Sequence, residues 1–148
     1  MALRDAYTHG VSRRNYKVEL LKRVPLFADC SRGELEQIAQ IADEIDLAEG
    51  KELTRLGASG REFFVLLEGE ADVSQDGEII NKMGPGDFFG EIALVEDTPR
   101  TATVTATTPV RVLVITDRSF RQLLEKQPEI QRKVLVALAE RVRPALGS

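Results

Sequence analysis

The stretch GPGDFFGEIALVEDTPRTATV, residues 84–104, separates the fold classes open to this chain. Its glycines Gly84, Gly86 and Gly90 follow the spacing G-x-G-x-x-x-G, whereas the dinucleotide fingerprint is G-x-G-x-x-G inside a strand–turn–helix unit. The chain also lacks the phosphate-loop pattern G-x-x-x-x-G-K-[ST]. Both observations argue against the common parallel-sheet nucleotide folds.

The segments on either side of this stretch have the length of β-strands and are divided by glycine. They read IDLAEG, KELTRLG, EFFVLLEG, EADVSQDG, EIINKMG, TATVTAT and VRVLVIT. Asp76-Gly77 is typical of a tight hairpin turn. A parallel sheet would need crossovers of a dozen or more residues, usually helical, and none is present. The pattern predicts an antiparallel sandwich or roll.

Helical patterns come before this β region. Residues 1–14 lack apolar periodicity and are expected to form a flexible tail. A short helix is predicted from Tyr16 to Val24, limited by Pro25. Ser31 followed by Glu34 is a capping box, which predicts that a second helix starts there.

Helical patterns also follow the β region. Thr116 or Asp117 could cap a helix through SFRQLLEK, which Gln127-Pro128 interrupts, and a last helix is expected from about 129 to 142. The prediction is a mainly β protein with flanking helices, in which residues 15–148 form one domain.

Composition excludes several kinds of chemistry. The one cysteine, Cys30, and the one histidine, His9, are too few for a His- or Cys-based metal site, and His9 lies in the expected tail. The net charge of −4 argues against a nucleic-acid-binding surface. No apolar run reaches the roughly 20 residues of a membrane helix. We therefore expect a cytoplasmic protein with no membrane contact, no metal and no catalytic residues.

The stretch itself carries the pattern of an anion site. Gly90 before Glu91 would open a short helical turn, where backbone N–H groups can face an anion. Glu91 could merely complement the helix dipole, or it could accept hydrogen bonds from sugar hydroxyls. Arg100 could be an ordinary surface arginine, but its guanidinium is suited to gripping two phosphate oxygens. Taken together, these residues favour a nucleotide with one phosphate.

The motifs F-G-E-I-A-L and P-R-T-A-T-V resemble the phosphate-binding cassette of the cyclic nucleotide-binding domain family. This module occurs in the catabolite activator protein, in kinase regulatory subunits and in cyclic-nucleotide-gated channels. The resemblance covers about residues 17–142. It implies an antiparallel, jelly-roll-like β-roll with N-terminal helices and C-terminal helices of the B/C lid type.

The resemblance also implies roles for particular residues. Glu91 would bind the ribose 2′-hydroxyl and Arg100 the exocyclic oxygens of the cyclic phosphate. The cradle would be completed by the backbone N–H groups of Gly90, Ile92, Ala93 and Thr101 or Ala102. Thr101 is compatible with cGMP without excluding cAMP. Leu135 and Val142 are further candidates for base contacts. The expected ligand-binding set is Val73, Asn81, Phe89, Gly90, Glu91, Ile92, Ala93, Arg100, Thr101, Ala102, Leu138 and Arg141.

The expected function is a non-enzymatic sensor of a cyclic nucleotide, cAMP before cGMP, that signals by moving its last helix. No cofactor is expected besides that ligand. The chain ends at Ser148 without a helix-turn-helix, so direct DNA binding is not expected, and the output would lie in an unknown protein partner or a missing output domain. The alternative is a β-roll that serves only as a protein-interaction module.

Overall fold

The computed structural model describes residues 13–95 and 98–147, with side chains described for 15–95 and 99–140. Most of the expected tail, residues 1–12, and the side chain of Arg141 lie outside this description. The first described helix, α2 (Arg13–Lys22), begins three residues before the predicted start at Tyr16 and ends two residues before Val24.

The N-terminal helical region continues with a short 3₁₀ helix and a second α-helix. Pro25 opens η1 (Pro25–Phe27), which explains why α2 stops short of it. The capping box that starts α3 (Arg32–Gln40) is confirmed. The Ser31 hydroxyl accepts from the Glu34 backbone N–H at 3.2 Å, and the Glu34 carboxylate accepts from the Ser31 N–H at 2.8 Å.

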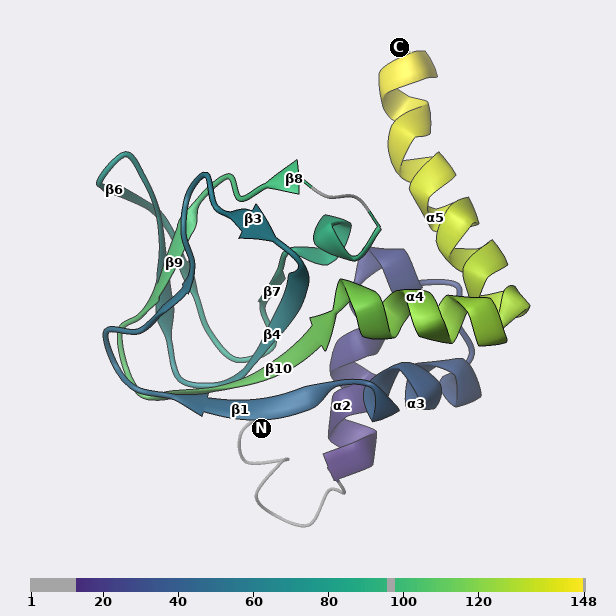
Figure 1. Ribbon diagram of the computed structural model, residues 1–148, viewed down its shortest axis with the longest axis horizontal. Helices are drawn as coiled ribbons and strands as arrows, with labels where there is room; N and C mark the ends of the chain where they lie inside the picture. The colour runs from purple at the N-terminus through teal and green to yellow at the C-terminus, as the bar shows by residue number, and fades with distance from the viewer. Residues whose placement is uncertain (1–12, 96–97, 148) are drawn as a thin grey trace.

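The middle of the chain forms an antiparallel β-roll, as predicted, with every strand pair antiparallel (Figure 1). One sheet has the order β1-β10-β4-β7, the other β2-β9-β5-β6, and β3 pairs with β8. The strands are β1 (Asp43–Leu47), β2 (Glu52–Thr54), β3 (Ser59–Gly60), β4 (Glu62–Glu68), β5 (Ala71–Gln75), β6 (Glu78–Met83), β7 (Phe88–Phe89), β8 (Thr98–Pro99), β9 (Thr103–Ala106) and β10 (Val110–Thr116).

The β5–β6 hairpin turns at the predicted dipeptide. Asp76 and Gly77 both have positive φ values, 51° and 83°. Two successive left-handed residues are what a two-residue type I′ turn requires, and Asp and Gly tolerate that conformation best. This turn joins β5 to β6, the edge strand of the second sheet.

Strand β4 lies between two hydrophobic cores. Its odd-numbered residues, such as Phe63, join a cluster with the N-terminal and C-terminal helices, where Phe63 and Phe120 pack around Phe27. Its even-numbered residues, Phe64 and Leu66, join the cluster inside the roll. Because side chains alternate along a strand, β4 is buried on both faces and connects the helical layer to the roll.

Two helices follow the roll. Thr116 caps α4 (Asp117–Lys126), because its hydroxyl accepts from the Ser119 N–H at 3.2 Å. After Gln127 the chain begins α5 (Pro128–Gly147), which runs five residues past the predicted end at Val142. None of the described helices has the length and apolar character to cross a membrane.

Helix α5 is anchored to the N-terminal helices by its first turns. Ile130 and Val134 are fully buried in the helical core. Lys133 Nζ lies 2.6 Å from Glu34 Oε1 at the start of α3. The hydrogen bond from Lys133, together with that from the Ser31 backbone, holds the pKa of Glu34 below its usual range. The later turns of α5 project away from the roll (Figure 1).

The lowered pKa of Glu34 gives stability a defined pH dependence. The contribution of the ionised carboxylate is fully present above its ordinary pKa of 4.5 and is lost as the pH falls through the lower folded-state value. Glu34→Gln keeps the capping acceptor but removes the charge facing Lys133. We expect it to lower Tm at pH 7 by about 1–4 °C. Thermal melts should show this difference shrinking below pH 4.5; an equal difference from pH 7 to pH 3 would contradict the assignment.

Candidate ligand-binding site

The site is built around the sharp turn at Gly90. Strand β7 pairs with β4, with Phe89 opposite Phe64, and the two rings are stacked at 4.9 Å. Gly90 then adopts φ 83° and caps the single-turn helix η2 (Glu91–Leu94), as the sequence predicted. A Cβ on Gly90 would lie 2.8 Å from the Glu62 carbonyl oxygen, so this close backbone approach requires glycine.

Arg100 is held by its backbone and by its side chain. Its N–H donates to the Ala58 carbonyl and its carbonyl accepts from the Gly57 N–H, both at 2.8 Å. Its guanidinium donates to the Glu62 carbonyl at 2.5 Å, with Cζ 5.9 Å from the Phe64 ring centroid. Burial lowers the pKa of Arg100, and the Glu62 charge opposes this shift. The result is a half-buried cation in a fixed position.

A pocket of about 590 Å³ opens beside Arg100, a volume typical of small-molecule sites. Thr54, Val104 and Val73 are direct neighbours in the register of β2, β9 and β5, and they form one row of its wall. The pocket is lined by Thr54, Val73, Phe88, Phe89, Gly90, Glu91, Ile92, Ala93, Pro99, Arg100, Thr101, Ala102 and Val104.

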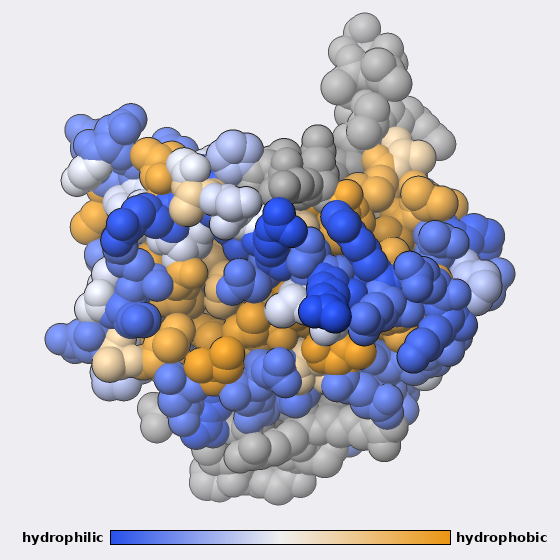
Figure 2. All heavy atoms as spheres, viewed as in Figure 1, coloured by the Kyte–Doolittle hydropathy of each residue, from blue (hydrophilic) through white to orange (hydrophobic). Residues whose placement is uncertain are grey.

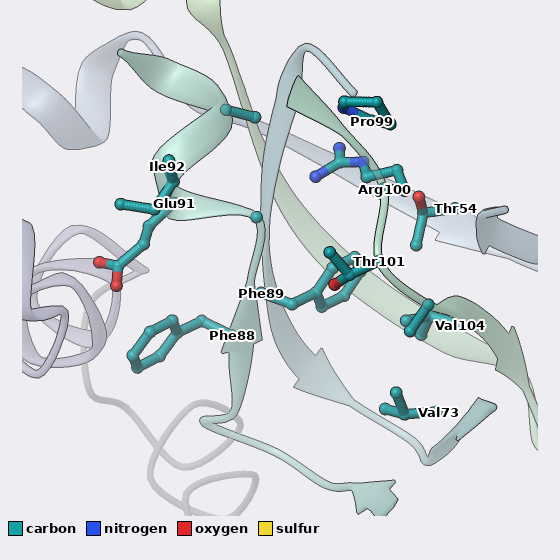
Figure 3. A pocket seen from close by; sticks show the side chains of 13 residues that line it. Thr54, Val73, Phe88, Phe89, Glu91, Ile92, Pro99, Arg100, Thr101 and Val104 are labelled. Carbon is teal, nitrogen blue, oxygen red and sulfur yellow. The ribbon is translucent and has the colours of Figure 1, made fainter. Parts of the chain in front are cut away.

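Figure 3 shows that the two charged side chains of the site point in different directions. Arg100, Thr101 and Phe89 lie together beside the row of Thr54, Val104 and Val73. The Glu91 carboxylate is turned to the other side, toward Phe88. Glu91 is only 7% exposed and is the one buried charged residue among those described. The structure therefore does not bring this carboxylate next to Arg100.

Nine of the twelve expected binding residues lie in the wall of this pocket. For Ala93 the expected backbone donor is already used, because its N–H donates to the Gly90 carbonyl at 3.0 Å. Thr101 is exposed, and its carbonyl accepts from the Gln75 side-chain amide at 2.8 Å, which fixes the segment after Arg100. The nine residues are Val73, Phe89, Gly90, Glu91, Ile92, Ala93, Arg100, Thr101 and Ala102.

The structure places Asn81, one of the expected ligand-binding residues, outside the pocket. Asn81 does stand directly opposite Val73, in line with the row of pocket residues. It belongs to the outermost strand, however, where residues 78–82 are all exposed, and it is not among the lining residues. Its side-chain oxygen accepts from the Lys82 N–H at 2.8 Å. The row of Thr54, Val104 and Val73 thus continues to Asn81 on β6, but the pocket ends at Val73.

Of the residues expected to contact the base from the last helix, Leu135 and Leu138 are described with their side chains, and neither lines the pocket. Leu138 packs instead against the helical core, because the stripe that it shares with Ile130 and Val134 anchors α5. Leu135 is 60% exposed and is not in the pocket wall either. Arg141 and Val142 belong to α5, but their side chains lie outside the described part of the chain.

Four lining residues were not predicted: Thr54, Phe88, Pro99 and Val104. Strand alternation gives a partial signal for two of them, Val104 and Thr54. Val104 is buried between two less buried neighbours, and Thr54 pairs directly with it. A strand register, which sequence alone leaves open, is needed to align these residues with Val73.

The polar groups of this site suit binding of an anion. Arg100 supplies a fixed cation, the Thr54 and Thr101 side chains supply hydroxyls, and valines and phenylalanines supply apolar walls. Within residues 13–95 and 98–147, no three His, Cys, Asp or Glu side chains come together in a way that could hold a metal ion. The arrangement fits a ligand with one anionic and one flat apolar part.

Comparisons with known proteins agree with this geometry. A family model described as "Cyclic nucleotide-binding domain" matches residues 44–127. The cAMP-dependent protein kinase regulatory subunit of Eremothecium gossypii is 35% identical over 115 residues, 77% of this chain and 25% of that protein. The cGMP-dependent protein kinase, isozyme 2, of Drosophila melanogaster is 33% identical over 132 residues, 84% of this chain and 14% of that protein.

One solved structure is similar to this chain over most of its own length. The N-terminal domain of a transcriptional regulator from Streptomyces coelicolor A3(2) is 32% identical, with a TM-score of 0.78. The match covers 86% of this chain and 93% of that one. In contrast, this chain spans only 25% and 14% of the two kinase proteins. The similarity to the two kinase proteins is therefore confined to a small part of each.

Proposed function

Because the chain belongs to the cyclic nucleotide-binding domain family, we propose that it is a non-enzymatic sensor that binds cAMP in preference to cGMP and signals through α5. The observation that carries the proposal is the guanidinium of Arg100, fixed at the Glu62 carbonyl and facing a pocket of about 590 Å³. A bidentate cation at an apolar pocket matches the cyclic phosphate and purine of such a ligand.

The chemistry of the pocket residues indicates where the phosphate, the purine and the ribose of the ligand would lie. The phosphate oxygens would lie at Arg100, where the guanidinium keeps donors not used by Glu62. The purine would lie against Val73 and Val104. The ribose 2′-hydroxyl would donate to Glu91, whose carboxylate must first turn from the Phe88 side toward the pocket (Figure 3). Ligand binding would thus include a local rearrangement of η2.

The composition of the wall supports adenine over guanine. On its edge guanine presents an N1–H, a 2-amino group and a 6-carbonyl, whereas adenine presents only N1 and a 6-amino group, so a buried guanine needs one more hydrogen-bonding partner. Asn81, the residue best suited to pair with that edge, lies outside the pocket. Of the two hydroxyls in the wall, we assign that of Thr101 to the guanine 2-amino group. We therefore place cAMP first and keep cGMP as a weaker ligand.

Helix α5 is proposed to carry the signal. In the described structure it is anchored through Lys133 and the core rather than to the pocket. Its next turn leaves Leu135 60% and Val136 38% exposed, and apolar surface gathers where α5 leaves the helical layer (Figure 2). Ligand binding would favour a second position in which this surface covers the pocket, with α5 turning near Gln127-Pro128.

Truncation of Arg100, the residue proposed to bind the phosphate, tests the proposal. Arg100→Ala should weaken cAMP binding by about 2–3 kcal/mol, or roughly 30- to 150-fold, because a half-buried charge-assisted contact is lost. The roll should remain folded. Arg55→Ala is the control, since Arg55 is an exposed arginine of the same roll that pairs with Glu52 and does not line the pocket. Titration calorimetry decides: equal affinity of Arg100→Ala and the parent protein would exclude this phosphate site.

The base preference predicts a second, asymmetric effect. Thr101→Ala should reduce affinity for cGMP by about three- to tenfold and affinity for cAMP less, because only guanine presents an amino group to that hydroxyl. Thr107→Ala removes an exposed hydroxyl outside the pocket and serves as the control. Competition binding with both nucleotides measures the two losses. Equal losses would mean that Thr101 does not read the base.

The role proposed for α5 predicts tighter binding when its anchor is weakened. Lys133→Met removes the ion pair that joins α5 to α3, so more molecules can adopt the covered state, and cAMP affinity should rise about two- to fivefold. Arg132→Met removes the same charge from a pair with Glu129 inside α5 and should leave the affinity unchanged. If both variants behave alike, the Lys133 ion pair does not oppose movement of α5.

A further inference from the structure

The side chain of Arg100 passes directly over Gly60. Strand β3 pairs with β8, with Gly60 opposite Thr98 and Ser59 opposite Pro99, so Arg100 is the residue that follows this pair. A Cβ built on Gly60 would overlap Arg100 Nε and would lie 2.5 Å from both Cδ and Cζ. Nε and Cζ belong to the guanidinium, and Cδ is the carbon to which it is attached. Gly60 thus provides the space that this group occupies.

The other side of the guanidinium is closed as well. A Cβ on Gly90 would overlap Arg100 Nη1, and the Glu62 carbonyl oxygen accepts from the guanidinium at 2.5 Å. The guanidinium therefore lies between two glycines and against one backbone oxygen. If a side chain at residue 60 occupied its present position, the guanidinium could not shift toward Gly90, because Arg100 Nη1 already lies close to that residue.

We propose that Gly60 is a positioning residue of the anion site: the absence of a side chain there fixes where Arg100 presents its charge. The proposal rests on the nucleotide-binding function proposed above. A methyl group at residue 60 would keep the charge of Arg100 but force the guanidinium away from the Glu62 carbonyl. Since affinity for an oxyanion depends on the direction of the donors, a displaced arginine binds more weakly than a fixed one.

Gly60 separates positioning from folding better than Gly90 does. Gly60 has a φ outside the left-handed region, and the three atoms nearest to its built Cβ all belong to the flexible Arg100 side chain. To relieve these three contacts, an alanine there requires movement of a side chain and not of the backbone. Gly90 has φ 83°, and its Cβ would also meet a backbone oxygen, so Gly90→Ala strains the chain itself.

The test is a double-mutant cycle between Gly60→Ala and Arg100→Ala, with cAMP as the probe. We expect Gly60→Ala alone to weaken binding about tenfold or more and to leave Tm within about 2 °C of the parent. In the Arg100→Ala background it should change affinity less than about twofold, because the group it displaces is gone. Gly84→Ala, where no atom lies within 4 Å of the added Cβ, is the control.

The outcomes are distinct. Equal losses in both backgrounds, no loss in either, or a melting temperature lowered as far as in Gly90→Ala would each overturn the positioning role.

A readout without nucleotide keeps this test separate from the proposed function. The Arg100 Nε–H signal in a ¹⁵N–¹H spectrum of the ligand-free chain can be assigned by its loss in Arg100→Ala. Gly60→Ala should shift this signal toward those of exposed arginines, whereas Gly84→Ala should not. An unshifted signal would refute the positioning role. If the parent protein binds no cyclic nucleotide but the signal shifts, the proposed function fails and the positioning of Arg100 by Gly60 stands.

Discussion

The hydrogen bond from the Arg100 guanidinium to the Glu62 carbonyl is the contact on which the site depends. A half-buried cation is tolerated only where its donors find acceptors and its surroundings leave space for it. The β3–β8 pair, the Phe64 ring and the glycines at 60 and 90 meet these needs. These elements thus surround one side chain, that of Arg100, and leave it space and an acceptor.

Strand β4 relates that site to the rest of the molecule. Glu62 begins β4, Phe64 on the roll side lies under Arg100, and Phe63 on the other side packs with Phe27 of the helical layer. The same helical core holds the start of α5. Strand β4 therefore contacts Arg100 on one face and, on the other, the core that holds the start of α5.

Local signals in the sequence predicted the fold well. The capping box at Ser31 and Glu34 and the Asp76-Gly77 turn are set by neighbouring residues, and both were correct. Where this structure departs from the expected site, distant contacts decide. Asn81 lies one strand beyond the pocket, and Leu138 is used in the helical core, which no local pattern reveals. The direction of the Glu91 carboxylate likewise depends on side-chain packing rather than on the motif that contains it (Figure 3).

The most direct test of the central claim is a calorimetric titration of the nucleotide-free chain with cAMP, with cGMP, and with 5′-AMP as the linear-phosphate control. The account predicts 1:1 binding of cAMP at micromolar or lower concentration, weaker binding of cGMP and much weaker binding of 5′-AMP. No binding of either cyclic nucleotide to a folded sample would contradict it and would favour a β-roll that acts only through protein contacts.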